Sequence, residues 1–271
     1  MTRHIVTNAP HSVMWGDCVM TATEKIKNKQ LRGVVAAASL LMITVVLCIF
    51  AGAMEKKADE QNSFLFASTE AKHPVFVIDP GHGGPDGGAV GVNGVIEKEI
   101  NLTISLKLRD MLEFWGFDTV MTRETDVSIH SPEADSVKEM KTSDLHNRLD
   151  IVEATPNSVY LGIHQNMFGQ SQYDGAQIFY GVHSSESERL AECLQTGFVS
   201  KLQPENIRQT KKAETNLFLL SNISGPAVLI ECGFISNPQE AALLCDEEYQ
   251  NKLVFVIFTA VAEYLSESTE G

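Results

Sequence analysis

The chain has 271 residues, of which 44% are hydrophobic and 21% charged, so it can bury one sizeable core and is not broadly disordered. Its formal net charge is −14, and the charge is uneven: from Glu55 onward 16 basic residues stand against 33 acidic ones, a balance of −17. A domain this acidic repels a phosphate backbone, which excludes nucleic acid as a partner.

The N-terminal part predicts a membrane anchor. Residues 1–32 show no apolar periodicity and are expected to form a disordered cytoplasmic tail. Gly33–Met54 contains 22 residues without a charge, enough at ~1.5 Å per residue to cross a hydrocarbon core of ~30 Å. The basic residues before it place the N-terminus in the cytoplasm and the rest of the chain outside. A signal peptide cleaved near "AGA" (51–53) is the alternative, but a secretory apolar region is usually shorter, so an uncleaved anchor is favoured.

Residues 55–72 are polar and are predicted to be a linker, followed by an extracytoplasmic domain over 73–271. In this domain, short apolar runs alternate with segments whose apolar residues recur at helical spacing. Strands are expected at 75–79, 117–123, 159–164, 175–181, 216–222 and 227–234, and helices at 97–116, 143–154, 185–202 and 246–265. This alternation predicts an α/β domain with a mostly parallel sheet flanked by helices, whose site lies at the carboxyl ends of the strands.

Two histidines occupy such strand ends. His82 lies in "VFVIDPGHGGPDGG" (Val75–Gly88), and His164 follows "VYLGI". The glycine-rich turn around His82 matches neither G-x-G-x-x-G nor G-K-[ST] and contains no lysine, which argues against a phosphate site. Two imidazoles at one sheet edge, with a carboxylate between them in sequence, can form a three-ligand zinc site with an open fourth position. The alternative is that each histidine is a hydrogen-bonded structural residue.

Four sequence blocks resemble, in order, the zinc-dependent N-acetylmuramoyl-L-alanine amidases of bacterial cell walls: "DPGHGGPDGGAVG", "EKEINL", "GIHQN" and "AVLIECGFISNPQE". The resemblance extends over nearly the whole predicted extracytoplasmic domain. It implies a single α/β domain with a six-stranded sheet, a Zn²⁺ cofactor and a peptidoglycan substrate. By position, it makes His82, Glu97 and His164 the zinc ligands and Glu231 the catalytic carboxylate.

These residue types suit amide hydrolysis, which needs a polarised carbonyl group and a deprotonated water. A His₂Glu zinc site supplies both, and a second carboxylate free of the metal carries a proton from the water to the leaving amine. Glu231 ends an apolar strand, which favours this role over the alternative of a helix-capping carboxylate. Glu97 is preferred to Glu99 as a ligand because it lies three residues before Ile100, near the buried face of the helix.

Further residues near these positions are expected to support the site. Asp79 either orients His82 or caps the turn, and Asp86 shapes the loop. Arg148 matches an arginine of the family and is assigned a structural salt bridge before a substrate contact. The segment Glu124–Thr142 lacks apolar periodicity and joins a strand to a helix, so we expect it to border the glycan groove or a protein partner.

Within the family, the chain is similar to the germination-specific amidases of the spore cortex. The similarity rests on the anchor, on the long loop after "MTRETD" and on "GAQIFY" after the second histidine strand. It implies removal of the stem peptide from cortex muramic acid as a step toward muramic-δ-lactam. The expected location is the cell membrane, facing the forespore intermembrane space, with an activator protein as an optional partner.

Two other functions stay open on the sequence alone. One is a zinc carboxypeptidase acting on stem peptides, which would need a cationic clamp for a terminal carboxylate; Arg123 and Arg148 are the candidates for it. The other is a non-catalytic wall-binding domain, which would be expected to lack one or more of the four site residues.

Overall fold

The computed structural model describes residues 73–267. The predicted tail, anchor and linker (1–32, 33–54 and 55–72) lie outside these residues. Within 73–267, none of the helices is both long and apolar enough to cross a membrane. The described residues form one α/β unit around a six-stranded sheet, as expected.

The sheet is mixed. Its strands are β1 (Val75–Pro80), β2 (Thr119–Met121), β3 (Ser158–Asn166), β4 (Gln177–Tyr180), β5 (Lys211–Lys212) and β6 (Ala227–Phe234). They lie in the order β2-β1-β3-β6-β4-β5; β4 is antiparallel to β6, and the other neighbouring pairs are parallel. The carboxyl ends of β1, β3 and β6 therefore meet at one edge, where sheets of this kind place their sites.

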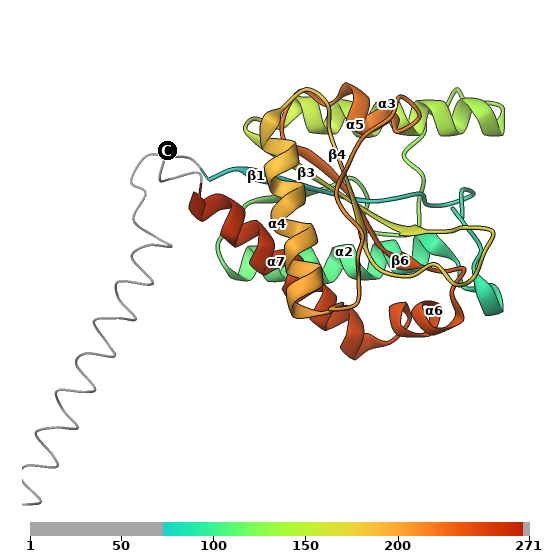
Figure 1. The fold of residues 1–271 in the computed structure, drawn as a ribbon. Coiled ribbons are helices and arrows are strands. Elements are labelled where there is room, and N and C mark those ends of the chain that lie inside the picture. The colour runs from blue at the N-terminus through green and yellow to red at the C-terminus, as the bar shows by residue number, and fades with distance from the viewer. Residues whose placement is uncertain (1–72, 268–271) are drawn as a thin grey trace, which may run out of the picture. The chain divides into compact units, whose positions relative to one another are not determined.

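Helices cover both faces of the sheet (Figure 1). On one face pack α2 (Glu97–Phe114), α4 (Ser185–Lys201) and α7 (Glu247–Glu267), and on the other α3 (Val137–Ala154) and α5 (Phe218–Asn222). Side chains that alternate along β1 divide between the two cores: Phe76 and Ile78 pack with the first group of helices, and Val77 with the second. The short 3₁₀ helix η1 (Val92–Gly94) and α6 (Pro238–Leu244) lie in connections at the same end of the sheet as the candidate site.

One of the six strands expected from the sequence is not a strand. Residues 216–222, expected as a strand, contain helix α5, whose Leu219 and Leu220 pack against the sheet. A short apolar run does not distinguish a buried strand from a buried helical turn. The sixth strand is instead β5, a two-residue edge strand with exposed lysines and no apolar pattern.

Helix α3 begins at Val137, well before the expected start at residue 143. Ser136 accepts a hydrogen bond from the Glu139 backbone N–H, and the Glu139 side chain accepts from the Ser136 N–H. This capping box satisfies N–H groups that the first turn of a helix leaves unpaired. Only Arg148 and Val152 of α3 are buried, so the first half of the helix carries no apolar stripe from which its start could be predicted.

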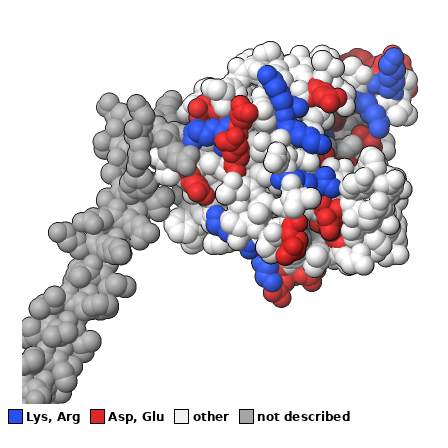
Figure 2. Space-filling view, in the orientation of Figure 1, with Lys and Arg blue, Asp and Glu red and all other residues white. Residues whose placement is uncertain are grey.

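Charged side chains of both signs are interspersed on the face shown in Figure 2. The lower right of that view, near α6 and the end of β6 in Figure 1, is mostly uncharged. In this mostly uncharged area, the electrostatic potential therefore depends on single charged side chains and not on a large patch of one sign.

Candidate active site

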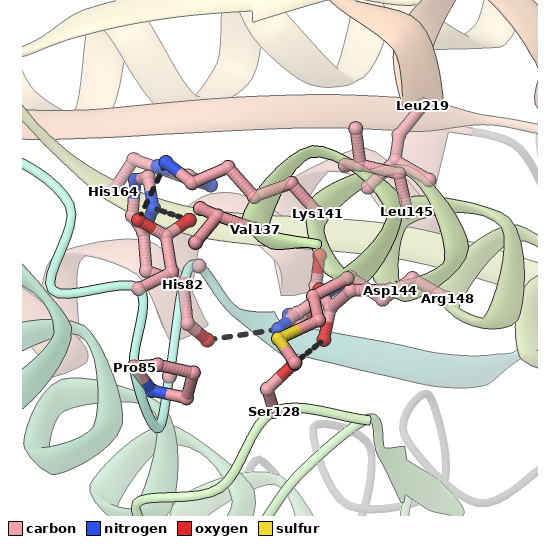
Figure 3. Close-up of a pocket in the computed structure, with 15 residues that line it drawn as sticks. His82, Pro85, Ser128, Val137, Lys141, Asp144, Leu145, Arg148, His164 and Leu219 are labelled. Atoms are coloured by element: carbon pink, nitrogen blue, oxygen red, sulfur yellow. Dashed lines mark hydrogen bonds and ion pairs between the residues drawn. The ribbon is translucent and has the colours of Figure 1, made fainter. Parts of the chain in front are cut away.

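The turn after β1 presents His82 to the site (Figure 3). His82 has a φ of 62°, in the left-handed region that residues other than glycine rarely adopt, and backbone hydrogen bonds between Gly83 and Asp86 close the turn. Asp86 Oδ2 lies 3.0 Å from His82 Nδ1, while His82 Nε2 lies 3.3 Å from Glu97 Oε2. Of the two roles left open for Asp79, the orientation of His82 is wrong, because Asp86 makes this contact.

Glu97 and His164 form a cluster with His82. Glu97 is the first residue of α2 and is 4% exposed, whereas Glu99 is exposed, as the helix-face argument predicted. Glu97 Oε1 lies 3.0 Å from His164 Nδ1 and accepts a hydrogen bond of 3.2 Å from the Gln165 backbone N–H. Each of the three side chains offers one nitrogen or oxygen atom that can ligate a metal ion, and these atoms all lie within 4.8 Å of one another.

Two glycines make room for this cluster. A Cβ atom on Gly81 would lie 2.2 Å from the Cε1 and Nε2 atoms of His164, and one on Gly88 would lie 2.6 Å from Glu97 Oε2. Gly88 also has a φ of 69°, which disfavours any side chain there. The glycine-rich turn thus serves the close packing of an imidazole and a carboxylate.

Two imidazoles and one carboxylate are a ligand set that suits Zn²⁺. Burial alone would raise the pKa of Glu97, but its hydrogen bonds with His164 and His82 hold this pKa far below the ordinary range. Burial lowers the pKa of His82, but contacts with Asp86 and Glu97 outweigh it and raise this pKa to about 9. The surroundings of His82 therefore stabilise positive charge, and a divalent cation fits the same surroundings.

Glu231 lies opposite His164 in the register of β3 and β6. Its side chain is partly exposed, but its Oε2 atom is covered and has no hydrogen-bond partner within the described residues. Burial raises the pKa of Glu231 to about 7, an effect that His164 opposes and Glu97 reinforces. A carboxyl group with this pKa and an unpaired oxygen is suited to general acid–base chemistry near neutral pH.

A buried ion pair supports the turn that carries His82. Arg148 is 2% exposed, pairs with Asp79, and donates hydrogen bonds to the carbonyl oxygens of Pro80 (3.0 Å) and His82 (2.8 Å). The Tyr160 hydroxyl donates to Asp79 Oδ2 at 2.6 Å. The structural salt bridge predicted for Arg148 is confirmed. Asp79 contributes to the site by holding Arg148, which in turn binds the carbonyl oxygens of the turn.

Arg123 supports the same turn, a role that no sequence signal indicated. It is buried and donates hydrogen bonds to the carbonyl oxygens of Pro80, Gly81 and Lys98 at 2.9 to 3.0 Å. Since Arg123 and Arg148 are both occupied by backbone oxygens, neither provides the cationic clamp that a carboxypeptidase would need.

A pocket of about 310 Å³ opens beside His82 and His164 (Figure 3). It lies between the turn after β1 and the first half of α3, and its wall is mostly apolar. Its lining includes Ser128, Val137, Met140, Lys141, Leu145 and Leu219. The segment 124–142 therefore borders the candidate site, as its length and position suggested.

Comparisons with known sequences agree with this geometry. Residues 76–263 match the family model described as N-acetylmuramoyl-L-alanine amidase. The germination-specific N-acetylmuramoyl-L-alanine amidase of Bacillus subtilis (strain 168) is 35% identical over 193 residues, which are 71% of this chain and 80% of that protein. The N-acetylmuramoyl-L-alanine amidase AmiA of Escherichia coli (strain K12) is 26% identical over 70% of this chain and 75% of its own length.

Solved structures with the same fold include the CwlD amidase from Clostridioides difficile, determined in complex with the GerS lipoprotein. It has a TM-score of 0.69 and 37% identity, and the match covers 72% of this chain and 99% of that one. The amidase AmiC2 of Nostoc punctiforme has a TM-score of 0.61 and 27% identity, over 71% of this chain and 97% of that one.

Proposed function

The chain belongs to the family of N-acetylmuramoyl-L-alanine amidases and has their activity, and from this premise we propose that it works with a zinc ion held by His82, Glu97 and His164. The bond cut is the amide between N-acetylmuramic acid and L-alanine in peptidoglycan. One observation carries the proposal: three donor side chains converge within 4.8 Å beside Glu231, whose Oε2 atom has no partner among the described residues.

In this proposal, Glu231 moves the proton. A bound zinc ion supplies Lewis acidity, polarising the carbonyl group and lowering the pKa of a bound water to ~7. Glu231 takes a proton from the attacking water and delivers it to the nitrogen of the departing alanine. The products are the carboxylate of the muramic acid side chain and a peptide with a free amino group. A pKa of about 7 lets one carboxyl group act first as base and then as acid.

The remaining residues fix the positions of these groups. Asp86 holds Nδ1 of His82, so that Nε2 is the nitrogen available to a metal. The Gln165 backbone N–H and the Asn101 side-chain amide donate to Glu97 Oε1, both at 3.2 Å, and restrict its rotation. Such outer contacts commonly change metal affinity by about 10- to 100-fold when removed.

The zinc proposal is tested by chelation and metal replacement. The chelated protein should lose amidase activity, and added Zn²⁺ should restore it, with about one zinc ion per chain by elemental mass spectrometry. Mass spectrometry of the digested peptidoglycan should show stem peptides that begin with L-alanine. Full activity in metal-free protein would reject the zinc proposal, and loss of a terminal D-alanine would indicate a carboxypeptidase instead.

We further propose that the physiological substrate is spore-cortex peptidoglycan, cut as a step toward muramic-δ-lactam. The support is the similarity to the germination-specific amidase of Bacillus subtilis. Assays on cortex and on vegetative walls, side by side, would test this, with faster release from cortex as the expected result. Equal rates on the two walls would remove the proposed preference.

An activator protein and a membrane location complete the proposal. The CwlD amidase from Clostridioides difficile forms a complex with the GerS lipoprotein, which supports a lipoprotein partner for this chain as well. The uncharged segment 33–54 supports a single-pass anchor with the catalytic domain outside the cytoplasm, facing the forespore intermembrane space. Fractionation of cells producing the full chain should recover it with the membrane, and recovery in the soluble fraction would contradict the anchor.

A further inference from the structure

Arg208 is an arginine beside the site for which amidase chemistry gives no role. It lies in the connection between α4 and β5 and is half-buried. Its guanidinium group lies 4.4 Å from the ring centre of Phe234 and 5.8 Å from that of Tyr173, and its Nε atom donates a 2.6 Å hydrogen bond to the Asp174 carbonyl oxygen. These contacts hold the guanidinium group in place before any ligand arrives.

Arg208 makes no ion pair with a carboxylate within residues 73–267, although the Glu240 carboxylate interacts with it electrostatically at longer range. Arg109, Arg148 and Arg189 each make an ion pair with a carboxylate, and Arg123 is buried against backbone oxygens. Arg208 meets only neutral acceptors there, the Asp174 carbonyl oxygen and, at 3.5 Å, the Oε1 atom of Gln177. A fixed guanidinium group that is not hydrogen-bonded to any carboxylate can still pair with an incoming anion.

The sheet places Arg208 next to the reacting groups. Gln177, the first residue of β4, is the direct register partner of Glu231 on β6. Partners on neighbouring antiparallel strands leave the same face of the sheet about 5 Å apart. Arg208 Nη1 donates a long hydrogen bond of 3.5 Å to Gln177 Oε1, so a single side chain links Arg208 to the register partner of Glu231. An extended peptide advances ~3.3–3.6 Å per residue, so the second residue of a stem peptide bound at Glu231 extends about one strand spacing or more from the scissile bond, the direction in which Gln177 and Arg208 lie if the peptide crosses β4.

Resting on the proposed amidase site, we propose that Arg208 binds the carboxylate of the second stem-peptide residue, the one that follows the L-alanine released by the enzyme. This residue carries either a free α-carboxylate, as D-glutamate, or a carboxamide, as D-isoglutamine. A guanidinium group pairs with the carboxylate through two N–H donors, whereas the carboxamide offers one acceptor oxygen and no charge. Arg208 thus makes the enzyme selective for the acidic form of its substrate.

The test compares two soluble substrates that differ at one group, N-acetylmuramoyl-L-alanyl-D-glutamate and its α-carboxamide, both blocked as the γ-methylamide so that no γ-carboxylate is free, with zinc-supplied protein. The parent should favour the carboxylate in kcat/KM by roughly 10-fold, mainly through KM, the usual worth of one charge-assisted hydrogen bond. Arg208→Gln should bring the ratio near one while carboxamide turnover changes little. Arg208→Lys keeps the charge without the planar fork and should retain part of the preference.

Lys211→Gln is the matched control, because Lys211 is an exposed cation on β5, three residues further along the chain. It should leave the substrate ratio of the parent unchanged. A purely structural Arg208 would give a variant with a lower melting temperature and both substrates slowed equally, and that result would overturn the proposal. A parent without preference would also overturn it. Failure of the amidase site itself differs from both, since neither substrate would then be cut.

Discussion

Gly81→Ala is expected to disable the site without removing any functional group. The added Cβ atom would lie 2.2 Å from Cε1 and Nε2 of His164, so the imidazole must retreat by roughly 1.2 Å to reach an ordinary contact of 3.4 Å. Gly81 does not have a positive φ, so the alanine backbone itself is unstrained. A misplacement of about 1 Å in a catalytic site can cost ~10²-fold in rate, and we expect a loss of this size in kcat.

The assay measures three quantities on Gly81→Ala: peptidoglycan turnover, zinc content per chain and melting temperature. Gly169→Ala is the matched control, because Gly169 lies in the loop after β3, has no positive φ, and would give its Cβ atom open space. The control should resemble the parent in all three. A Gly81→Ala protein with parental turnover and zinc content would show that His164 can move freely, and it would refute the assignment of this histidine as a fixed ligand.

Three other predictions concern residues that form or support the candidate site. Glu231→Gln should keep zinc content near that of the parent and lower turnover by ~10²–10⁴-fold, whereas Glu97→Gln should lower zinc content and turnover together and recover in part in excess zinc. The opposite pattern would mean that base and ligand are exchanged. Asp86→Asn should weaken zinc binding by ~10–100-fold in a competition assay with a chelator, and unchanged affinity would remove its orienting role. Arg148→Met leaves the Asp79 charge buried and unpaired, so it should destabilise the fold by ~3–5 kcal/mol in urea unfolding at pH 7.

The last of these variants should also show a pH dependence. Burial acts to raise the pKa of Asp79, but Arg148, Thr122 and Tyr160 together hold it below the ordinary value. A carboxyl group with a lowered folded-state pKa stabilises the protein above its unfolded-state pKa and loses this contribution as the pH falls. The stability gap between parent and Arg148→Met should therefore narrow in acid. If the difference in unfolding free energy stays constant down to pH 3, the variant is destabilised by lost packing and not by the unpaired charge of Asp79.

The sequence predicted the parts of the site that follow from periodicity. His82 and His164 end apolar strands, and two parallel neighbours in one sheet must bring such ends together. Helical spacing from Ile100 separated buried Glu97 from exposed Glu99. These predictions depend on which face of a helix or strand a residue occupies, and the spacing of apolar residues in a single sequence indicates that face.

Contacts that depend on an unusual backbone conformation or on tertiary packing could not be predicted in the same way. The His82–Asp86 contact depends on the left-handed conformation of His82, which no local pattern indicates. Arg123 and Tyr160 meet the turn only through tertiary packing. Strand β5 consists of two exposed lysines and has no apolar pattern from which it could be predicted. Residues 216–222 were expected as the sixth strand instead, because the apolar residues of α5 are buried against the sheet, as those of a strand would be.

The reversed direction of β4 has a consequence for how such an enzyme could be redesigned. A parallel strand would have to be reached by a crossover that returns to the opposite end of the sheet, usually through a helix. Because β4 is antiparallel to β6, while β3 is parallel to it, the connection 167–176 begins and ends at the catalytic edge. It carries the exposed rings of Phe168 and Tyr173. Doubling the length of a flexible loop costs only about 0.6 kcal/mol. Residues can therefore be inserted into this connection between Phe168 and Tyr173, before the Tyr173 and Asp174 contacts with Arg208, to change which wall polymer the enzyme contacts.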